Sequence, residues 1–354
     1  MKKKKKEKKI LYQLIFSAFL LFSNAYLVKA NSDILSQDST GKYCINTEQD
    51  YYNFIENIQN YNNKTVILCN DIDISDVPEA TSSFGGILNG KGHTITYASK
   101  EAKENIAVFP FRINDNGIVE NINVQIDESY AYNSETDEFQ TVFSQCDGIA
   151  KGITIKGNVT CIYDDEDENV SIGAIEGNGT LMDSSIAITY DLQSEKTIEE
   201  IAEDIVENDL EFEFCQLGTT YTGITYQNCI GYGQYSEAIK SLADELEPKI
   251  EDDTWGYLCV SFTRKSFSST SASATNCYYD KENMPDIKIR SEYIANRDNN
   301  KEFPNYADFG KTTSEMKNQG TYEGFDFNKK WTISPEDNNG YPYYNLQTEE
   351  ITLK

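Results

Sequence analysis

Short apolar stretches recur along the chain, and each opens on a turn. Four of them start at a glycine, in the phrases "GKGHTITY", "GIVENINV", "GIAKGITI" and "GTLMDSSIAI", and two later ones, "ITYQNCIG" and "ASATNCYY", lack that glycine. Residues five and seven positions after each start share one face of a strand, because side chains alternate with a period of two. The residues five positions on are Ile95, Ile122, Ile153, Ser184, Cys229 and Cys277.

The spacing of these phrases predicts a solenoid. Successive phrases begin 27, 31, 31, 45 and 48 residues apart, as expected when each coil stacks its strand on the preceding one. We therefore expect an all-β protein built as a single right-handed parallel β-helix over residues 31–310. Polar residues four positions after the start would stack as a structural ladder: Asn121, Asp183, Asn228 and Asn276.

Two helical patterns account for the two long intervals. Residues 197–208 begin with a capping box, Thr197 and Glu200, and residues 236–250 repeat the same apolar periodicity. Both segments are acidic on the opposite face. We expect these inserted helices to lie against the side of the solenoid, with a partner-binding role as the alternative.

The N-terminus and the charge indicate an exported protein. Residues 1–30 combine a lysine-rich start, about a dozen apolar residues and small residues, which is typical of a signal peptide and too short for a membrane span. This segment holds eight lysines and one glutamate, so the remainder has 23 basic and 57 acidic residues, a net charge of −34. Such a charge disfavours nucleic acid and anionic membranes as partners. The C-terminus shows no hydrophobic tail, so we expect release from the cell, with at most non-covalent association with its surface.

Eight cysteines in an exported chain permit disulfides. Cys44 and Cys69 are predicted to lie on neighbouring coils and to form one bridge, and Cys146 is paired with Cys161. The pairing of Cys215, Cys229, Cys259 and Cys277 stays open, and buried thiols stacked in the core are the alternative. With one histidine and no close cysteine pair, zinc is not expected.

The phrases "FGGILNGKGHTI", "NGIVENINV" and "ITYQNCIG" resemble the GLUG-type and related β-helix repeats of exported surface proteins from low-GC Gram-positive bacteria. The resemblance spans nearly all of residues 42–347. It implies a helical entry cap at residues 47–58, where Thr47 and Asp50 cap a helix that closes the open end of the solenoid. It also implies a C-terminal capping segment at residues 311–354, recognised from "MKNQGTYEGFDFNKKWTISPEDNNGYPYYNL".

No residue stands out as catalytic. His93 falls in a turn between strands, and its own stretch offers neither an acid nor a nucleophile as a partner. Asp71 and Asp73 share a strand face, and a turn-and-ladder role is favoured for them. β-Helices also carry polysaccharide lyases and glycoside hydrolases of the pectate-lyase-like type, so an enzyme is the alternative. Three or more charged side chains clustered beside a concave groove would indicate such an enzyme.

One acidic loop has the spacing of a calcium site. Asp165, Asp167, Asn169, Ser171 and Glu176 follow the ligand spacing of a calcium loop. Val170, however, occupies the position that requires glycine, and strand phrases flank the loop instead of helices. A solvated surface loop is favoured, with weak calcium binding as the alternative; no other cofactor is expected.

These observations favour an exported, non-catalytic protein that binds a surface protein or a glycan. Tyrosines suit either ligand, because they bury area at little entropic cost. Tyr341, Tyr343 and Tyr344 are crowded into "GYPYYN". We expect them to pack over the last coil, with ligand binding as the second interpretation.

Overall fold

The computed structural model describes most of the chain beyond the predicted signal peptide. The described residues are 35–75, 77–78, 80, 82–98, 107–131, 139–163, 170–217, 223–251, 254–261, 273–285, 287–291 and 309–346. The signal-peptide prediction, residues 1–30, lies outside them. Within these ranges no helix is both long and apolar enough to cross a bilayer.

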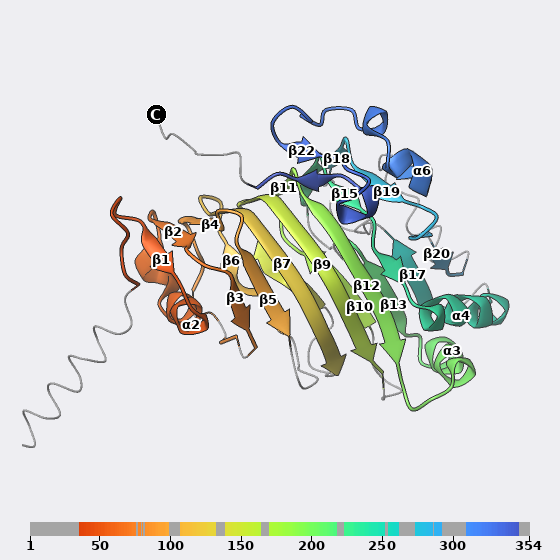
Figure 1. Cartoon of the computed structure of the whole chain (residues 1–354). Helices are drawn as coiled ribbons and strands as arrows, with labels where there is room; N and C mark the ends of the chain where they lie inside the picture. Colours follow the sequence, from red (N-terminus) through yellow and green to blue (C-terminus); the bar gives the residue numbers. More distant parts are fainter. Residues whose placement is uncertain are drawn as a thin grey trace, which may run out of the picture.

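A large parallel sheet forms the body of the molecule (Figure 1). Nine strands follow one another across it: β1 (Tyr43–Ile45), β2 (Thr65–Leu68), β4 (Ile87–Asn89), β7 (Ile118–Ala131), β9 (Ile149–Ile162), β12 (Ser185–Gln193), β15 (Ile230–Gly231), β19 (Tyr278–Asp280) and β21 (Gly310–Lys311). Shorter strands belong to the same sheet: β3 (Ile72–Ile74), β5 (Thr94–Ala98), β11 (Thr180–Met182), β14 (Thr225–Gln227), β16 (Gln234–Tyr235) and β18 (Ser273–Thr275). A mostly β, parallel architecture is thus confirmed.

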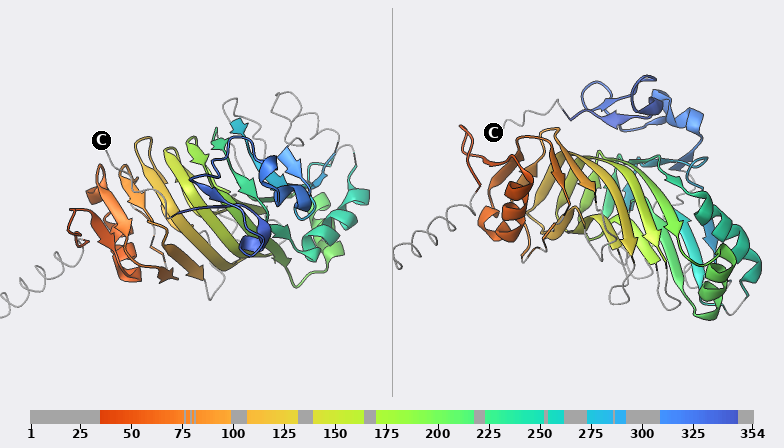
Figure 2. Two further views of the ribbon diagram at one scale, coloured as in Figure 1. Left: turned by 45° about the horizontal axis from the view of Figure 1, so that its top comes forward. Right: turned by 60° about the horizontal axis from the view of Figure 1, so that its bottom comes forward.

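A second sheet faces the first (Figure 2). Its strands are β6 (Phe109–Ile113), β8 (Phe139–Cys146), β10 (Val170–Ile175), β13 (Glu211–Cys215), β17 (Tyr257–Ser261) and β20 (Ile287–Ile289), parallel except for the last pair. The chain passes from β7 to β8, back to β9, on to β10 and back to β11 and β12, so it alternates between the sheets. The apolar side chains between the sheets form one continuous core.

The core columns follow the sequence repeat with one displacement. Ile122 pairs with Ile153, and both are fully buried. Ile95, however, pairs with Val124, not with Ile122. Asn89 and Thr94 are five residues apart in the sequence, but their partners on β7, Glu120 and Asn123, are only three residues apart. The difference of two residues is taken up by Lys91 and Gly92, which form a left-handed turn with φ of 53° and 81°. The predicted alignment of the first repeat is therefore wrong by two residues.

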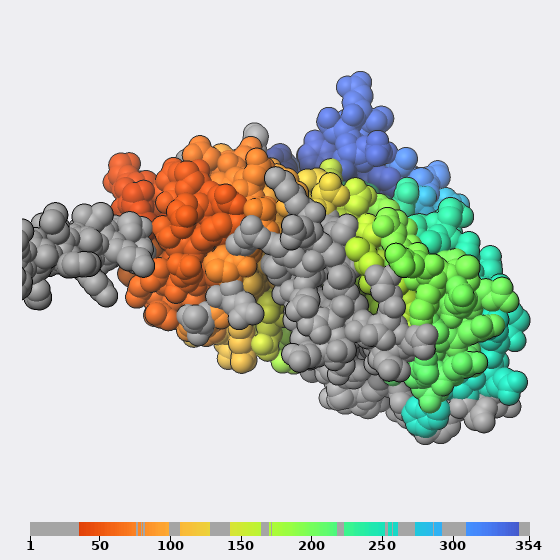
Figure 3. All heavy atoms as spheres, turned by 90° about the horizontal axis from the view of Figure 1, so that it is seen from below, coloured from red at the N-terminus to blue at the C-terminus, as the bar shows by residue number. Residues whose placement is uncertain are grey.

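Helices lie at both ends of the core. At the entry, α2 (Glu48–Glu56) is capped by Thr47, whose hydroxyl accepts a hydrogen bond from the Asp50 amide at 3.2 Å. Its Phe54 ring meets Phe84 and Phe111 edge to face. At the other end, α3 (Ile198–Glu207) carries the expected capping box and packs beside α4 (Glu237–Leu246). Figure 3 shows the entry coils and these helices at opposite ends of the molecule.

The C-terminal segment, residues 309–346, differs from a simple cap over the last coil. Its short helix α6 (Thr313–Met316) does lie beside β19 and β21. The chain then returns along the side of the large sheet toward the N-terminal end, where β22 (Trp331–Thr332) pairs with β23 (Tyr343–Tyr344) (Figure 2). A second apolar cluster, which includes Trp331 and Tyr344, joins this segment to Ile230 and Tyr278 of the sheet.

Candidate functional site

The polar ladder lies under the C-terminal segment. Asn121, Asp183, Asn228 and Asn276 have left-handed φ of 50–55°, as does Gly152 at 60° between the first two. The Asn228 amide donates to the Asp183 carboxylate at 3.0 Å, and the Asn276 amide donates to Asn228 at 3.3 Å. Left-handed backbone favours Asn, Asp and Gly, which explains this composition.

The C-terminal segment contacts the ladder from one end to the other. Gly324 lies against Asn276, the Lys330 ammonium meets the Asp183 carboxylate at 3.0 Å, and Tyr344 lies over Gly152. Further along, Leu346 lies beside Gly92 in the first coils. The bare backbone at Gly152 makes room for the Tyr344 ring, since a Cβ there would meet it.

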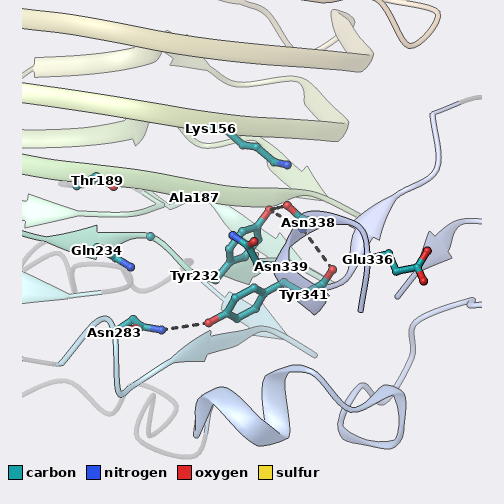
Figure 4. A pocket seen from close by; sticks show the side chains of 11 residues that line it. Lys156, Ala187, Thr189, Tyr232, Gln234, Asn283, Glu336, Asn338, Asn339 and Tyr341 are labelled. Carbon is teal, nitrogen blue, oxygen red and sulfur yellow. Dashed lines mark hydrogen bonds between the residues drawn. The ribbon is translucent and has the colours of Figure 1, made fainter. Parts of the chain in front are cut away.

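A groove of about 410 Å³ opens between this segment and the outer face of the large sheet (Figure 4). Its volume is in the range of small-molecule sites, roughly 300–1,000 Å³. Strands β9 and β12 supply Lys156, Ala187 and Thr189, and the C-terminal segment supplies Glu336, Asn338, Asn339 and Tyr341. Tyr232, Gly233, Gln234 and Asn283 complete the lining. We call this set the groove.

Two stacked tyrosines form one wall of the groove. The rings of Tyr232 and Tyr341 are 4.6 Å apart and nearly parallel, at 12°. The Asn338 amide donates to the Tyr232 hydroxyl at 3.0 Å and to the Tyr341 and Pro342 carbonyls at 3.3 Å. Burial raises the pKa of Tyr232 to about 12. This wall is therefore rigid and neutral at physiological pH.

A buried carboxylate fixes Tyr341. Asp280 is fully buried and accepts hydrogen bonds from the Tyr341 hydroxyl at 2.5 Å, from Thr313 at 2.8 Å and from Asn283 at 2.9 Å. The pKa of Tyr341 is raised, first by burial and then by this bond to Asp280. The last coil and the C-terminal segment are thus joined by a charge-assisted hydrogen-bond network.

A left-handed turn presents Asn339 to the groove. Asn338, Asn339 and Gly340 have consecutive positive φ of 50°, 53° and 83°. For a residue other than glycine this conformation costs about 1–2 kcal/mol, least for asparagine, and persists where surrounding contacts impose it. Here the Asn338 side chain supplies those contacts, and the exposed Asn339 amide is left facing the groove (Figure 4).

Lys156 places a cation in the groove. It projects from β9 beside Ala187, its partner on β12, whose small side chain leaves the space open. The lysine is half-buried, and this burial lowers its pKa. No carboxylate in the part of the chain that the structure describes lies within 4.0 Å of its ammonium group.

His93 lies away from the groove, and it has an acidic partner. Its Nδ1 is 3.1 Å from Asp71 Oδ1, and this same oxygen accepts the Thr94 amide at 2.8 Å. The pKa of Asp71 is lowered, first by the Thr94 amide and then by His93. The stretch around His93 contains no such partner, because Asp71 lies 22 residues earlier in the chain, just before β3. The pair is exposed, at 36% and 72%, and joins a turn to the strand before it.

The predicted disulfide between Cys44 and Cys69 is confirmed, with Cα atoms 5.8 Å apart. The predicted partners Cys146 and Cys161 do not form a disulfide, although both thiols are buried. Cys146 ends β8 in the second sheet, whereas Cys161 lies near the end of β9 in the large sheet, where it is paired with Leu192. The two cysteines therefore do not occupy neighbouring positions of one sheet, as the predicted bridge requires.

Of the four cysteines whose pairing was left open, two are stacked on neighbouring coils. Cys229 and Cys277 lie at matching positions, because the residues that follow them, Ile230 and Tyr278, are paired. Burial raises the pKa of Cys229 well above its usual value, and the adjacent Cys277 thiol raises it further. Neither forms a disulfide, so these two residues match the alternative of stacked core thiols.

Most of the calcium candidates cannot be compared with the fold. Asp165, Asp167 and Asn169 lie outside the described residues. Glu176 follows β10, and its backbone carbonyl accepts the Cys146 amide at 2.6 Å. Among the described residues no group of three or more His, Cys, Asp or Glu side chains is placed to hold a metal ion.

Comparison with known proteins identifies no relative. The chain matches no protein-family model, and neither curated proteins nor solved structures give a significant match. The functional argument therefore depends on the groove and on the chemistry of its residues.

Proposed function

We propose that this chain is an exported, non-catalytic β-helix protein of the GLUG-related type, whose groove binds a glycan outside the cell. Support for a right-handed solenoid comes from strands that alternate between two sheets and pair in register with the next coil. Parallel strands joined by crossovers are right-handed in nearly all proteins. Support for export comes from the leader-like N-terminus and from the Cys44–Cys69 disulfide.

One observation carries the binding proposal: the groove holds polar side chains with no partner of their own. Thr189, Gln234 and Asn339 line it, and none donates or accepts a side-chain hydrogen bond within the described chain. A concave site with convergent polar groups is the usual form of a small-molecule site. Hydroxyl and amide groups match the hydroxyls of a sugar, which both donate and accept hydrogen bonds.

A lyase or hydrolase requires more converging charge than the groove offers. Lys156 and Glu336 are the two charged side chains among its lining residues, fewer than the three set as the mark of an enzyme. Two-carboxylate glycoside hydrolysis needs a second acid opposite the first, and Glu336 is the one carboxylate in this lining. Binding without turnover is therefore the function we propose.

Two side chains in matched backbone conformations test the site. Asn339 and Asn63 are both exposed and left-handed, with φ of 53° and 59°, so glycine removes either amide without backbone strain. Immobilised glycans retained by the wild-type protein should bind Asn339→Gly about 2- to 12-fold more weakly, the loss of one hydrogen bond. Asn63→Gly should bind like wild type.

The same glycans decide between binding and catalysis. Incubation of the protein with each retained glycan should release no reducing ends and no unsaturated sugars. Glycan cleavage that is lost in Glu336→Gln would replace the binding proposal with the enzyme alternative. Equal binding by Asn339→Gly, Asn63→Gly and wild type would show that the groove is not the glycan site.

A further inference from the structure

Lys156 is unusual in a chain that is rich in carboxylates. The sequence has 58 acidic and 31 basic residues, and several other partly buried lysines of the described chain have acidic partners. Lys151 meets Glu120 at 3.0 Å, and Lys196 meets Asp204 at 2.8 Å. Lys156 has no such partner, although its position on the outer sheet face is flanked by Gln125 and Ala187, where an acidic residue would fit.

An unpaired, half-buried cation favours an anion that enters from outside. Burial disfavours the charged form of lysine, and an opposite charge within about 4–6 Å restores it. Because Lys156 is half-buried, its ammonium group is screened less by water than one on an open surface, which strengthens such a pair. In Figure 4 the Lys156 ammonium extends toward the Tyr232 and Asn338 side of the groove, within the same hollow as Asn339.

We propose that the ligand of the groove is an anionic saccharide, whose carboxylate or sulfate pairs with Lys156. Its hydroxyls would be bound by Thr189, Gln234 and Asn339, which line the same space. The inference rests on the proposed function and adds the charge class of the glycan. Glu336 on the opposite wall would orient the saccharide, because it repels the anionic end of the saccharide and accepts hydrogen bonds from its hydroxyls.

Matched glycans test the charge requirement. An array would carry uronate-containing, sialylated and sulfated oligosaccharides, each beside its carboxyl-reduced or desulfated counterpart. The wild-type protein should retain at least one anionic member and bind its neutral counterpart at least about tenfold more weakly, as expected for a hydrogen bond to a charged group. Preference for the carboxylated or the sulfated members identifies which anion pairs with Lys156.

Variants of Lys156 test the residue. Lys156→Gln should lose at least about tenfold in affinity for the anionic member and little for the neutral one, while Lys156→Arg should retain most of the affinity. Lys91→Gln removes an exposed lysine far from the groove and should change neither. A cooperative thermal unfolding transition in each variant would show that it is folded.

The failures of the two proposals can be told apart. The charge inference is overturned if the protein retains neutral glycans as well as their anionic counterparts and Lys156→Gln does not change that retention. Glycan binding itself would then still stand. Retention of no glycan at all overturns both.

Discussion

Lys156 keeps an ammonium group half-buried on the outer face of β9, next to Ala187. Burying a charge without a partner costs folding free energy, and such costs are tolerated where a side chain serves binding. Lys156→Met should therefore raise the free energy of unfolding at pH 7, measured with denaturant. Lys91→Met, at an exposed site, should leave it nearly unchanged.

The pH dependence of this difference has a defined sign. Burial holds the folded-state pKa of Lys156 below its ordinary value of 10.5, so the unfolded chain binds more protons between these two values. The stability of the wild-type protein should then rise with pH relative to Lys156→Met, and the gap should close as pH passes 10.5. A gap that widens over this range would show that the lysine has a stabilising partner.

Asn228 shows how one residue type meets two demands of the ladder. Its backbone is left-handed, with a φ of 52°, and its side-chain amide donates a hydrogen bond to the Asp183 carboxylate. Asn228→Gly removes the whole side chain and fits the left-handed backbone, whereas Asn228→Ala removes the amide but keeps a Cβ that disfavours this conformation. We expect the alanine variant to be less stable than the glycine variant by about 1 kcal/mol in denaturant unfolding. Equal stability would mean that the backbone relaxes at this corner.

Other residues of the site could not be found from the sequence. The Asn and Asp residues of the ladder could be recognised in the sequence, because they recur at the same position of successive repeat phrases. The Asp71–His93 pair and the groove were missed, because their members come from different coils or from opposite ends of the chain. The "NNG" at residues 338–340 is a local turn signal, but nothing local shows that this turn faces Lys156.

At the scale of elements, the C-terminal segment is joined to the sheet by several polar contacts, two of which involve charged groups. The Tyr341 hydroxyl bonds the buried Asp280, and Lys330 meets Asp183. Tyr341→Phe should destabilise this segment by about 1–3 kcal/mol, because a buried carboxylate loses a donor. Hydrogen exchange should speed up in residues 316–346, while β7 and β9 stay protected.

Tyr343→Phe provides the control for this variant. Tyr343 lies two residues further on, in the short strand β23, and is half-exposed; its hydroxyl forms no hydrogen bond within the described chain. Exchange in the segment should match that of wild type. If Tyr341→Phe accelerated exchange equally in β7 and β9, the segment and the sheet would form one cooperative unit.

The elements themselves were predictable to different degrees. The inserted helices followed from periodicity and caps, since Thr197 and Glu200 specify a helix start locally. The strand columns also followed from local alternation. The return of the C-terminal segment along the ladder did not, because it depends on contacts such as Tyr344 over Gly152, which join residues nearly 200 apart and leave no period in the sequence.

At the scale of the whole molecule, the structure has two apolar clusters with different contributors. The main core is built from the two sheets and their flanking helices. The second cluster joins Ile230 and Tyr278 to Trp331, Tyr341 and Tyr344 of the C-terminal segment. The groove lies beside this second cluster and takes one wall from each part.

Shortening the chain separates these two parts. A chain that ends at Lys317 keeps α6 and the Thr313–Asp280 hydrogen bond, but loses Trp331, Asn339 and Tyr341. Because the main core draws on none of the removed residues, we expect its far-UV circular dichroism to retain the β signal. Ile230 and Tyr278 would become exposed, so the shortened protein should bind a hydrophobic dye and self-associate at high concentration. Glycan binding should be lost, because one wall of the groove is absent.

A chain that ends at Leu346 keeps both clusters and should match the full-length protein in every assay. Retained glycan binding by the shorter chain would place the site elsewhere on the protein, and loss of the β signal would show that the C-terminal segment is required for the sheets to fold.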